Sequence, residues 1–170
     1  MEHFPKFEAE EIGKVKPGTF CGFMKNGKLH LGFAFVNPLH RTPGYSALDF
    51  LSLSPGVEAF DNRPGFGGGA DNFFAKSLII FPDARIRLPF EAGSTRTGMS
   101  DEEIAGAVVL IDGVLAISAL VERSARLISL EDGTPMTRRA PFHPYFPSWS
   151  VETKDTDGTW KTLCAFNFGV

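Results

Sequence analysis

Four Asn-Gly or Asp-Gly pairs constrain the fold of this chain more than any other feature of its sequence. They are Asn26-Gly27, Asp112-Gly113, Asp132-Gly133 and Asp157-Gly158. Asn or Asp followed by Gly accepts the left-handed backbone of a tight turn, so such pairs join neighbouring antiparallel strands. The sequence therefore predicts a chain built from β-hairpins.

The clearest hairpin lies in residues 19–36, around Asn26-Gly27. A two-residue turn there predicts that Phe20 lies opposite Phe33 and Met24 opposite Leu29. Because side chains alternate between the two faces of a strand, one face is expected to form core, and it carries Phe20, Met24, Leu29, Leu31, Phe33 and Phe35. The other face is smaller and mixed, and it would line a cavity or meet another layer. Its members are Thr19, Cys21, Phe23, His30, Gly32, Ala34 and Val36.

Further strands are expected along the rest of the chain. They comprise residues 46–53, a hairpin over 76–91 around Pro82-Asp83-Ala84, a hairpin at Asp112-Gly113, and residues 125–131. A last hairpin over 148–170 places Trp149 opposite Phe166 and Val151 opposite Cys164. One face of it would carry Trp149, Val151, Trp160, Cys164, Phe166 and Phe168. A capping box at 100–103 predicts a short helix near 101–106.

Together these elements predict an all-β fold, an antiparallel β-sandwich or barrel of about nine or ten strands with one short helix. Residues 1–17 form a polar N-terminal arm, and residues 18–170 form a single β domain. A length of 170 residues suits one domain.

Composition excludes several classes of protein. The chain is 43% hydrophobic with a net charge of -3, so it is neither disordered nor an evident nucleic-acid binder. Its two cysteines, Cys21 and Cys164, rule out a disulfide scaffold and are expected to be reduced core thiols. The N-terminus lacks the pattern of a signal peptide, which predicts synthesis and folding in a cytoplasm.

Residues 104–121 form an apolar stretch that approaches the length of a membrane-spanning helix. Asp112-Gly113 lies in its middle, where a charge would be costly in a bilayer and where a hairpin turn is favoured. We therefore expect a buried hairpin and no membrane partner.

Motifs for catalysis and cofactors are weak. Residues 65–70 match the letters of a dinucleotide-binding motif, but they lie in a long Gly-rich loop over 54–74 rather than between a strand and a helix. The four histidines, His3, His30, His40 and His143, lack metal-ligand spacing. No catalytic residue, metal or cofactor is therefore predicted.

A few residues are candidates for binding a ligand. His30, His143, Arg138 and Arg139 are polar or basic groups that would orient one. Arg85 and Arg87 share one strand face, where they would bind an anion, face solvent or form ion pairs between subunits.

The segment His143-Pro144-Tyr145-Phe146 resembles a short motif of the aldose epimerases (mutarotases), a family that uses a His as general acid. The resemblance covers four residues, and the family's other catalytic positions have no match in this chain. It implies a sugar-modifying enzyme in which His143 is the acid.

Aromatic residues outside the expected strands point to an interface. They lie in the arm, the Gly-rich loop and the Pro-rich segment over 135–149, and comprise Phe4, Phe7, Phe60, Phe66, Phe73, Phe74, Phe142, Tyr145 and Phe146. Aromatic side chains are enriched in interfaces between proteins. The same segments would alternatively fold back over the chain's own core.

The sequence thus favours a non-enzymatic structural subunit that associates with copies of itself or with other assembly subunits, in a ring, a tube or a virion shell. The alternative is a small-molecule-binding β-barrel with a Phe-lined pocket, in which His30 or an Arg orients the ligand. A sugar-modifying enzyme that uses His143 is the third reading.

Overall fold

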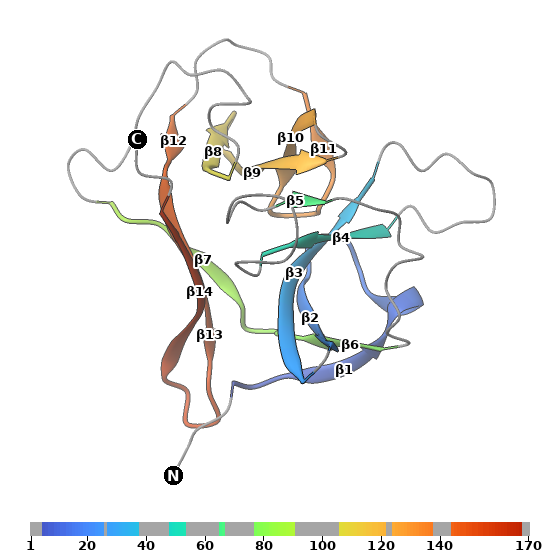
Figure 1. The fold of residues 1–170 in the computed structure, drawn as a ribbon. Coiled ribbons are helices and arrows are strands. Elements are labelled where there is room, and N and C mark those ends of the chain that lie inside the picture. Colours follow the sequence, from blue (N-terminus) through green and yellow to red (C-terminus); the bar gives the residue numbers. More distant parts are fainter. Residues whose placement is uncertain are drawn as a thin grey trace.

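The protein is an all-β molecule made of two sheets that face each other, as the sequence predicts (Figure 1). The structure is a computed structural model that describes residues 5–25, 27–37, 48–53, 65–66, 77–90, 106–121, 124–137 and 144–167. The larger sheet has eleven strands and the smaller has three. In the described residues the strand order of the larger sheet has two ends, β1 and β11, so the sheet is not a closed barrel.

The larger sheet runs in the order β1-β6-β2-β3-β4-β5-β9-β10-β11, with β8 on β9 and β12 on β8. Its strands are β1 (Glu8–Glu11), β2 (Phe20–Lys25), β3 (Lys28–Val36), β4 (Leu48–Ser52), β5 (Gly65–Phe66), β6 (Ser77–Ile80), β8 (Val108–Ile111), β9 (Val114–Val121), β10 (Ser124–Ser129), β11 (Pro135–Met136) and β12 (Tyr145–Phe146). The smaller sheet runs β14-β13-β7, with β7 (Arg85–Arg87), β13 (Ser148–Lys154) and β14 (Trp160–Asn167).

The described residues contain fourteen strands, more than the nine or ten predicted. The strands that the sequence missed are short. They include β1 within the predicted arm and β5 within the predicted Gly-rich loop. Residues 101–105 of the helix expected near 101–106 lie outside the described residues, and Gly106 lies in a turn. The described residues contain one 3-10 turn, η1 (Ile12–Lys14).

The register of the β2–β3 hairpin is confirmed, with Phe20 opposite Phe33 and Met24 opposite Leu29. The expectation that this whole face is core is wrong at the turn. Met24 is 57% exposed and Leu29 40% exposed, because they lie at the tip of the hairpin, beyond the point where the core ends at Leu31.

The opposite face of this hairpin meets another layer, as one of the two alternatives predicts. Cys21 and Ala34 are buried there with Phe50 and Leu78, and Val15 from the N-terminal segment covers them. The larger sheet is therefore buried on both faces near β2, β3 and β4.

The predicted hairpin over 76–91 is wrong. β6 pairs with β1 and β2 in the larger sheet, whereas β7 pairs with β13 in the smaller one. A turn in which the Ala84 N–H donates to the Phe81 carbonyl carries the chain from one sheet to the other. Leu78 of β6 packs with Cys21 and Phe50 on the outer side of the larger sheet, whereas Leu88, just after β7, packs in the main core between the sheets. The crossing therefore buries apolar side chains from both segments.

The last hairpin begins in the predicted register, with Trp149 opposite Phe166 and Val151 opposite Cys164. The pairing then shifts by one residue. Glu152 lies opposite Thr162, so Leu163 is an extra residue in β14. The shift places Trp160 on the outer face, where it is 36% exposed, and not on the core face that the sequence predicts.

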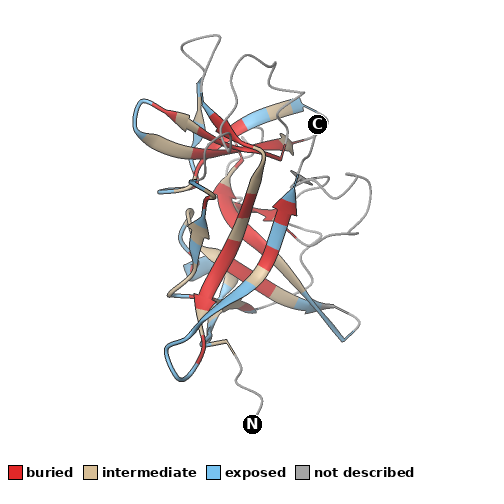
Figure 2. Ribbon diagram, turned by 90° about the vertical axis from the view of Figure 1, so that its left-hand side faces the viewer, coloured by how far each residue is buried: buried red, intermediate tan, exposed pale blue. Residues whose placement is uncertain are grey.

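The main core lies between the two sheets, and buried positions follow the strands on both sides of it (Figure 2). Phe33, Phe35 and Leu51 of the larger sheet face Trp149 and Phe166 of the smaller. The Trp149 and Phe166 rings stack with centroids 4.2 Å apart, and the Trp149 indole N–H donates to the Gly106 carbonyl at 2.8 Å. The ring stack joins β13 to β14 within the smaller sheet, and the hydrogen bond to Gly106 links that sheet to the segment that leads into β8 of the larger one.

The N-terminal segment ties the two sheets together at one end. β1 pairs with β6 in the larger sheet, while Pro5 bridges to Asp155 and the Lys6 N–H donates to the Lys154 carbonyl beside the smaller sheet. Part of the predicted arm thus lies against the chain's own strands.

The apolar stretch around Asp112-Gly113 folds as the predicted hairpin, β8–β9. Both turn residues have positive φ, 50° for Asp112 and 84° for Gly113, as a tight hairpin turn of this type requires. Within the described ranges, no helix is long and apolar enough to cross a membrane.

Candidate functional site

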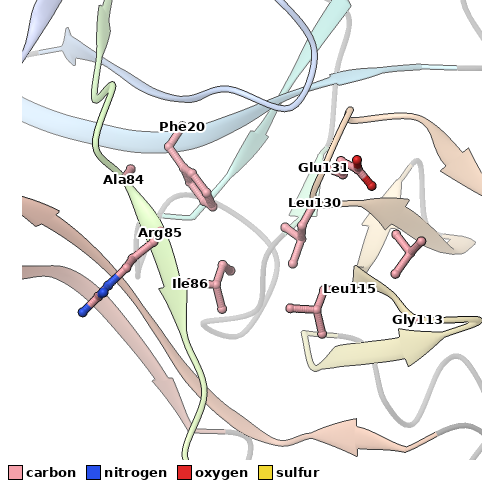
Figure 3. Close-up of a pocket in the computed structure, with 9 residues that line it drawn as sticks. Phe20, Ala84, Arg85, Ile86, Gly113, Leu115, Leu130 and Glu131 are labelled. Carbon is pink, nitrogen blue, oxygen red and sulfur yellow. The ribbon is translucent and has the colours of Figure 1, made fainter.

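An apolar pocket of about 390 Å³ opens between the two sheets, where β7 faces the β8–β9 turn (Figure 3). Its lining residues come from both sheets and are Phe20, Ala84, Arg85, Ile86, Gly113, Val114, Leu115, Leu130 and Glu131. This volume lies at the small end of the ~300–1,000 Å³ typical of ligand pockets.

The apolar side chains that line the pocket also pack against the main core. Phe20, Ile86, Leu115 and Leu130 are half-buried and pack against the core from one side. The Leu130 N–H donates to the Leu115 carbonyl at 2.9 Å, which holds the two backbone segments that carry these side chains together. The pocket is therefore an open hollow whose side-chain walls are mostly apolar and come from strands and turns of both sheets.

Arg85 contributes no charge to the interior of the pocket. Its guanidinium points away from Ile86 and Leu115, toward the outer face of the smaller sheet (Figure 3). There it lies 3.4 Å from the centre of the Trp160 ring and donates from Nη2 to Glu152 Oε2 at 3.1 Å. Glu131, by contrast, is an exposed carboxylate on the lining of the pocket.

Of the sequence-predicted ligand residues the structure describes His30, which does not line this pocket. His30 lies on the other face of β3 from Phe33 and stacks on Phe23 with ring centroids 5.2 Å apart. Its buried Nδ1 has no hydrogen-bond partner among the described residues. His143, Arg138 and Arg139 lie outside the described residues, so the role that the aldose epimerase resemblance gives His143 stays a prediction.

The predicted interface aromatics fall into four groups. Phe7 is 56% exposed, whereas Tyr145 and Phe146 are buried inside the chain's own core. Their burial follows the alternative in which the aromatic segments fold back over the core. For Phe66 the structure places only the backbone, in β5. Phe4, Phe60, Phe73, Phe74 and Phe142 lie outside the described residues.

Phe90 is an exposed aromatic residue that the sequence reasoning missed. It is 82% exposed, and its ring centroid lies 5.8 Å from that of Phe146. The sequence feature that could have indicated this exposure is Pro89. Proline has no N–H to donate to a neighbouring strand, so the pairing of β7 with β13 ends before it and Phe90 lies beyond the sheet.

Arg85 and Arg87 form ion pairs within the chain. Both guanidinium groups donate to the carboxylate of Glu152, each at 3.1 Å. Burial raises the pKa of Glu152, but the hydrogen bonds from Arg87 and Arg85 and their positive charges outweigh burial and lower it. Glu152 is therefore ionised at neutral pH.

The two thiols lack nucleophilic character. Burial raises the pKa of both Cys21 and Cys164 to about 12, and both are free and buried. In the part of the chain that the structure describes, no three His, Cys, Asp or Glu side chains gather to hold a metal ion.

Comparison with protein family models finds no match for this chain. Comparison with curated proteins and with solved structures also finds none. Function is therefore inferred from the geometry of the chain alone.

Proposed function

We propose that the protein is a non-enzymatic binding protein, and that the pocket between its two sheets takes a small apolar molecule. The observation that carries this proposal is the ring of six half-buried apolar side chains around an opening of about 390 Å³, which are Phe20, Ala84, Ile86, Val114, Leu115 and Leu130. Covering apolar surface is favourable by about 25 cal/mol per Å². A ligand that fills the opening would gain this stabilisation without a rearrangement of the strands.

The charges around the pocket favour a neutral or amine-bearing ligand over a carboxylate. The sequence reasoning expected His30 or an Arg to orient the ligand, but His30 lies elsewhere and Arg85 turns away. Glu131, which lines the opening, would repel an anion and attract an amine or accept a hydrogen bond from a hydroxyl.

The test is to fill the pocket with a side chain. Nile red, a neutral fluorescent probe, should bind the wild-type protein and brighten. Ala84→Phe places an aromatic ring in the opening and should abolish the signal. Ala9→Phe makes the same substitution at an exposed position of β1 and is the matched control.

If the Ala84→Phe protein brightens the probe as strongly as wild type does, the pocket is not the binding site and the proposal fails. Loss of the signal in both variants would equally contradict it, because binding would then not depend on this pocket. Circular dichroism of each variant verifies that the fold is retained.

Self-association into a structural assembly is the second candidate function. It is favoured by the exposed apolar side chains of Phe90, Met24 and Phe7, which are 82%, 57% and 56% exposed. Large apolar side chains left in water are typical of surfaces that bind other proteins. Rings, tubes and virion shells built from copies of the chain belong to this candidate.

Light scattering on a sizing column tests this second candidate. A defined multimer of the 18.6 kDa chain at micromolar concentration would support it, and a clean monomer would exclude it. Replacing Phe90 with Ser should dissociate the multimer if this side chain is an anchor.

A further inference from the structure

A second hollow lies on the outer face of the smaller sheet, on the side away from the apolar pocket. Its volume is about 450 Å³, and its lining includes Arg87, Phe90, Ser150, Glu152, Thr162 and Ala165. The Glu152 carboxylate is held by Arg85 and Arg87, so it lies between two guanidinium groups. The strand register explains why it is hollow. One row across the three strands consists of Arg87, Ser150 and Ala165. The short side chains of Ser150 and Ala165 form the bottom of the hollow, and the long side chain of Arg87 stands at its edge.

Positive charge is in excess on this face, although the chain as a whole has a net charge of -3. The outward positions of β7, β13 and β14 carry three cations, Arg85, Arg87 and Lys154, against the single carboxylate of Glu152. Three cations and one carboxylate leave a net charge of +2 on these outward positions, although Arg85 and Arg87 both pair with Glu152.

Arg87 is held in place and still faces solvent. Its Nη1 donates to Glu152 Oε1 at 3.1 Å, while the side chain is 70% exposed. Arg85 holds the same carboxylate from the other side and stacks on Trp160. A guanidinium fixed in this way loses little rotamer freedom when it binds an anion, and its remaining N–H groups suit an oxyanion.

Two hydroxyl-bearing side chains, Ser150 and Thr162, also line the hollow. Ser150 lies beside Arg87 in the strand register, and Thr162 lies beside Glu152 in the next row. The Ser150 and Thr162 hydroxyls are hydrogen-bond donors on the same face as the Arg87 guanidinium. The exposed ring of Phe90 forms an apolar wall next to them.

We propose that this hollow binds a phosphate monoester of a small aromatic or apolar molecule. Arg87 pairs with the phosphate, Ser150 and Thr162 donate hydrogen bonds to it, and Phe90 packs against the organic part. The site is independent of the apolar pocket and of the function proposed for that pocket.

Calorimetric titration with phenyl phosphate, inorganic phosphate and benzoate tests the proposal. Phenyl phosphate should bind most tightly, since it alone offers both a tetrahedral anion and a ring. Arg87→Gln should weaken it by about tenfold or more, the effect of losing a charge-assisted hydrogen bond. Arg126→Gln removes an exposed arginine from β10, in the other sheet, and should leave binding unchanged.

Amide chemical shifts of the wild-type protein give a second measurement that needs no variant. Phenyl phosphate should move the resonances of Ser150 and Thr162 and spare those of β10. Equal weakening by Arg87→Gln and Arg126→Gln, or shifts that avoid β13 and β14, would overturn the site. Benzoate that binds as tightly as phenyl phosphate would overturn the assignment to a phosphate ester.

Discussion

At the scale of single residues, Gly32 and Phe50 show how a missing side chain shapes this sheet. Gly32 lies on β3, and the ring of Phe50 from β4 occupies the space where a Cβ on residue 32 would stand. Phe50 in turn meets the ring of Phe23 at a centroid distance of 5.2 Å. Glycine is therefore required here by packing and not by backbone conformation.

Gly32→Ala should destabilise the fold by about 1–3 kcal/mol, the usual effect of forcing an extra group into a packed core. Urea denaturation measures the change. Gly13→Ala is the matched control, because a Cβ at residue 13 meets nothing within 4 Å. Similar stability losses in the two variants would contradict the packing role of Phe50.

The two cysteines give a second prediction at this scale. Their pKa values of about 12 mean that almost no thiolate exists at neutral pH, and both side chains are buried. A disulfide-exchange reagent such as Ellman's reagent should titrate no thiol in the native protein and two after unfolding in guanidinium. Rapid reaction of either cysteine in the native state would show that the fold leaves it accessible.

At the scale of elements, the sequence predicts hairpins well and strand neighbours poorly. The registers of β2–β3 and of the first half of β13–β14 follow from turn pairs and alternation alone. The assignment of β6 and β7 to different sheets does not, because a short turn at Pro82 is compatible with both a hairpin and a crossing between layers. The pairing of β5 with β9 joins segments far apart in the chain, and no local pattern encodes it.

The extra residue in β14 has an effect that fluorescence can measure. Trp160 is turned outward and 36% exposed, whereas Trp149 is buried at 3% exposure. Acrylamide should quench the Trp149→Phe protein strongly, because only Trp160 remains, and the Trp160→Phe protein weakly. Weak quenching of both variants would indicate the regular register, in which Trp160 lies on the core face.

The ion pairs across β7 and β13 should make stability depend on pH. The pKa of Glu152 in the folded chain lies below its ordinary value of 4.5, so its contribution is complete above that value and is lost as the pH falls through the lowered pKa. Glu152→Gln should therefore cost about 1–2 kcal/mol at neutral pH, since both Arg partners are exposed and solvent screens their charges.

Urea denaturation of wild type and of Glu152→Gln at neutral and acid pH measures this dependence. The difference between them should shrink in acid. Glu11→Gln, which removes an exposed ion pair with Lys14, should show little difference at either pH. A gap that stays constant down to acid pH would contradict the role of the Glu152 charge.

At the scale of the whole molecule, two facing sheets leave an apolar opening where their edges diverge. The sequence predicts the all-β class and several hairpins, because turn pairs and alternation are local, and it predicts that aromatic residues line a cavity or an interface. It does not predict which side chains line the opening. Phe20, Ile86, Leu115 and Leu130 come from four separate segments that meet only after the sheets pack.

The candidate ligand residues show the same limit. Strand alternation predicts the mixed face of β3 for His30, and the structure has it there, stacked on Phe23, but alternation does not predict that the pocket opens elsewhere. The sequence shows Arg85 as part of a basic pair, yet its partner Glu152 lies 67 positions away. Long-range pairing decides which groups meet, and no single segment contains that information.

Native mass spectrometry of the protein purified from its own source cells tests the central claim most directly. We predict an 18.6 kDa chain that carries a small organic molecule, neutral or amine-bearing, which is released on collisional activation and is absent from Ala84→Phe. A bare chain, or a bound molecule that Ala84→Phe retains, would contradict binding in the pocket between the sheets.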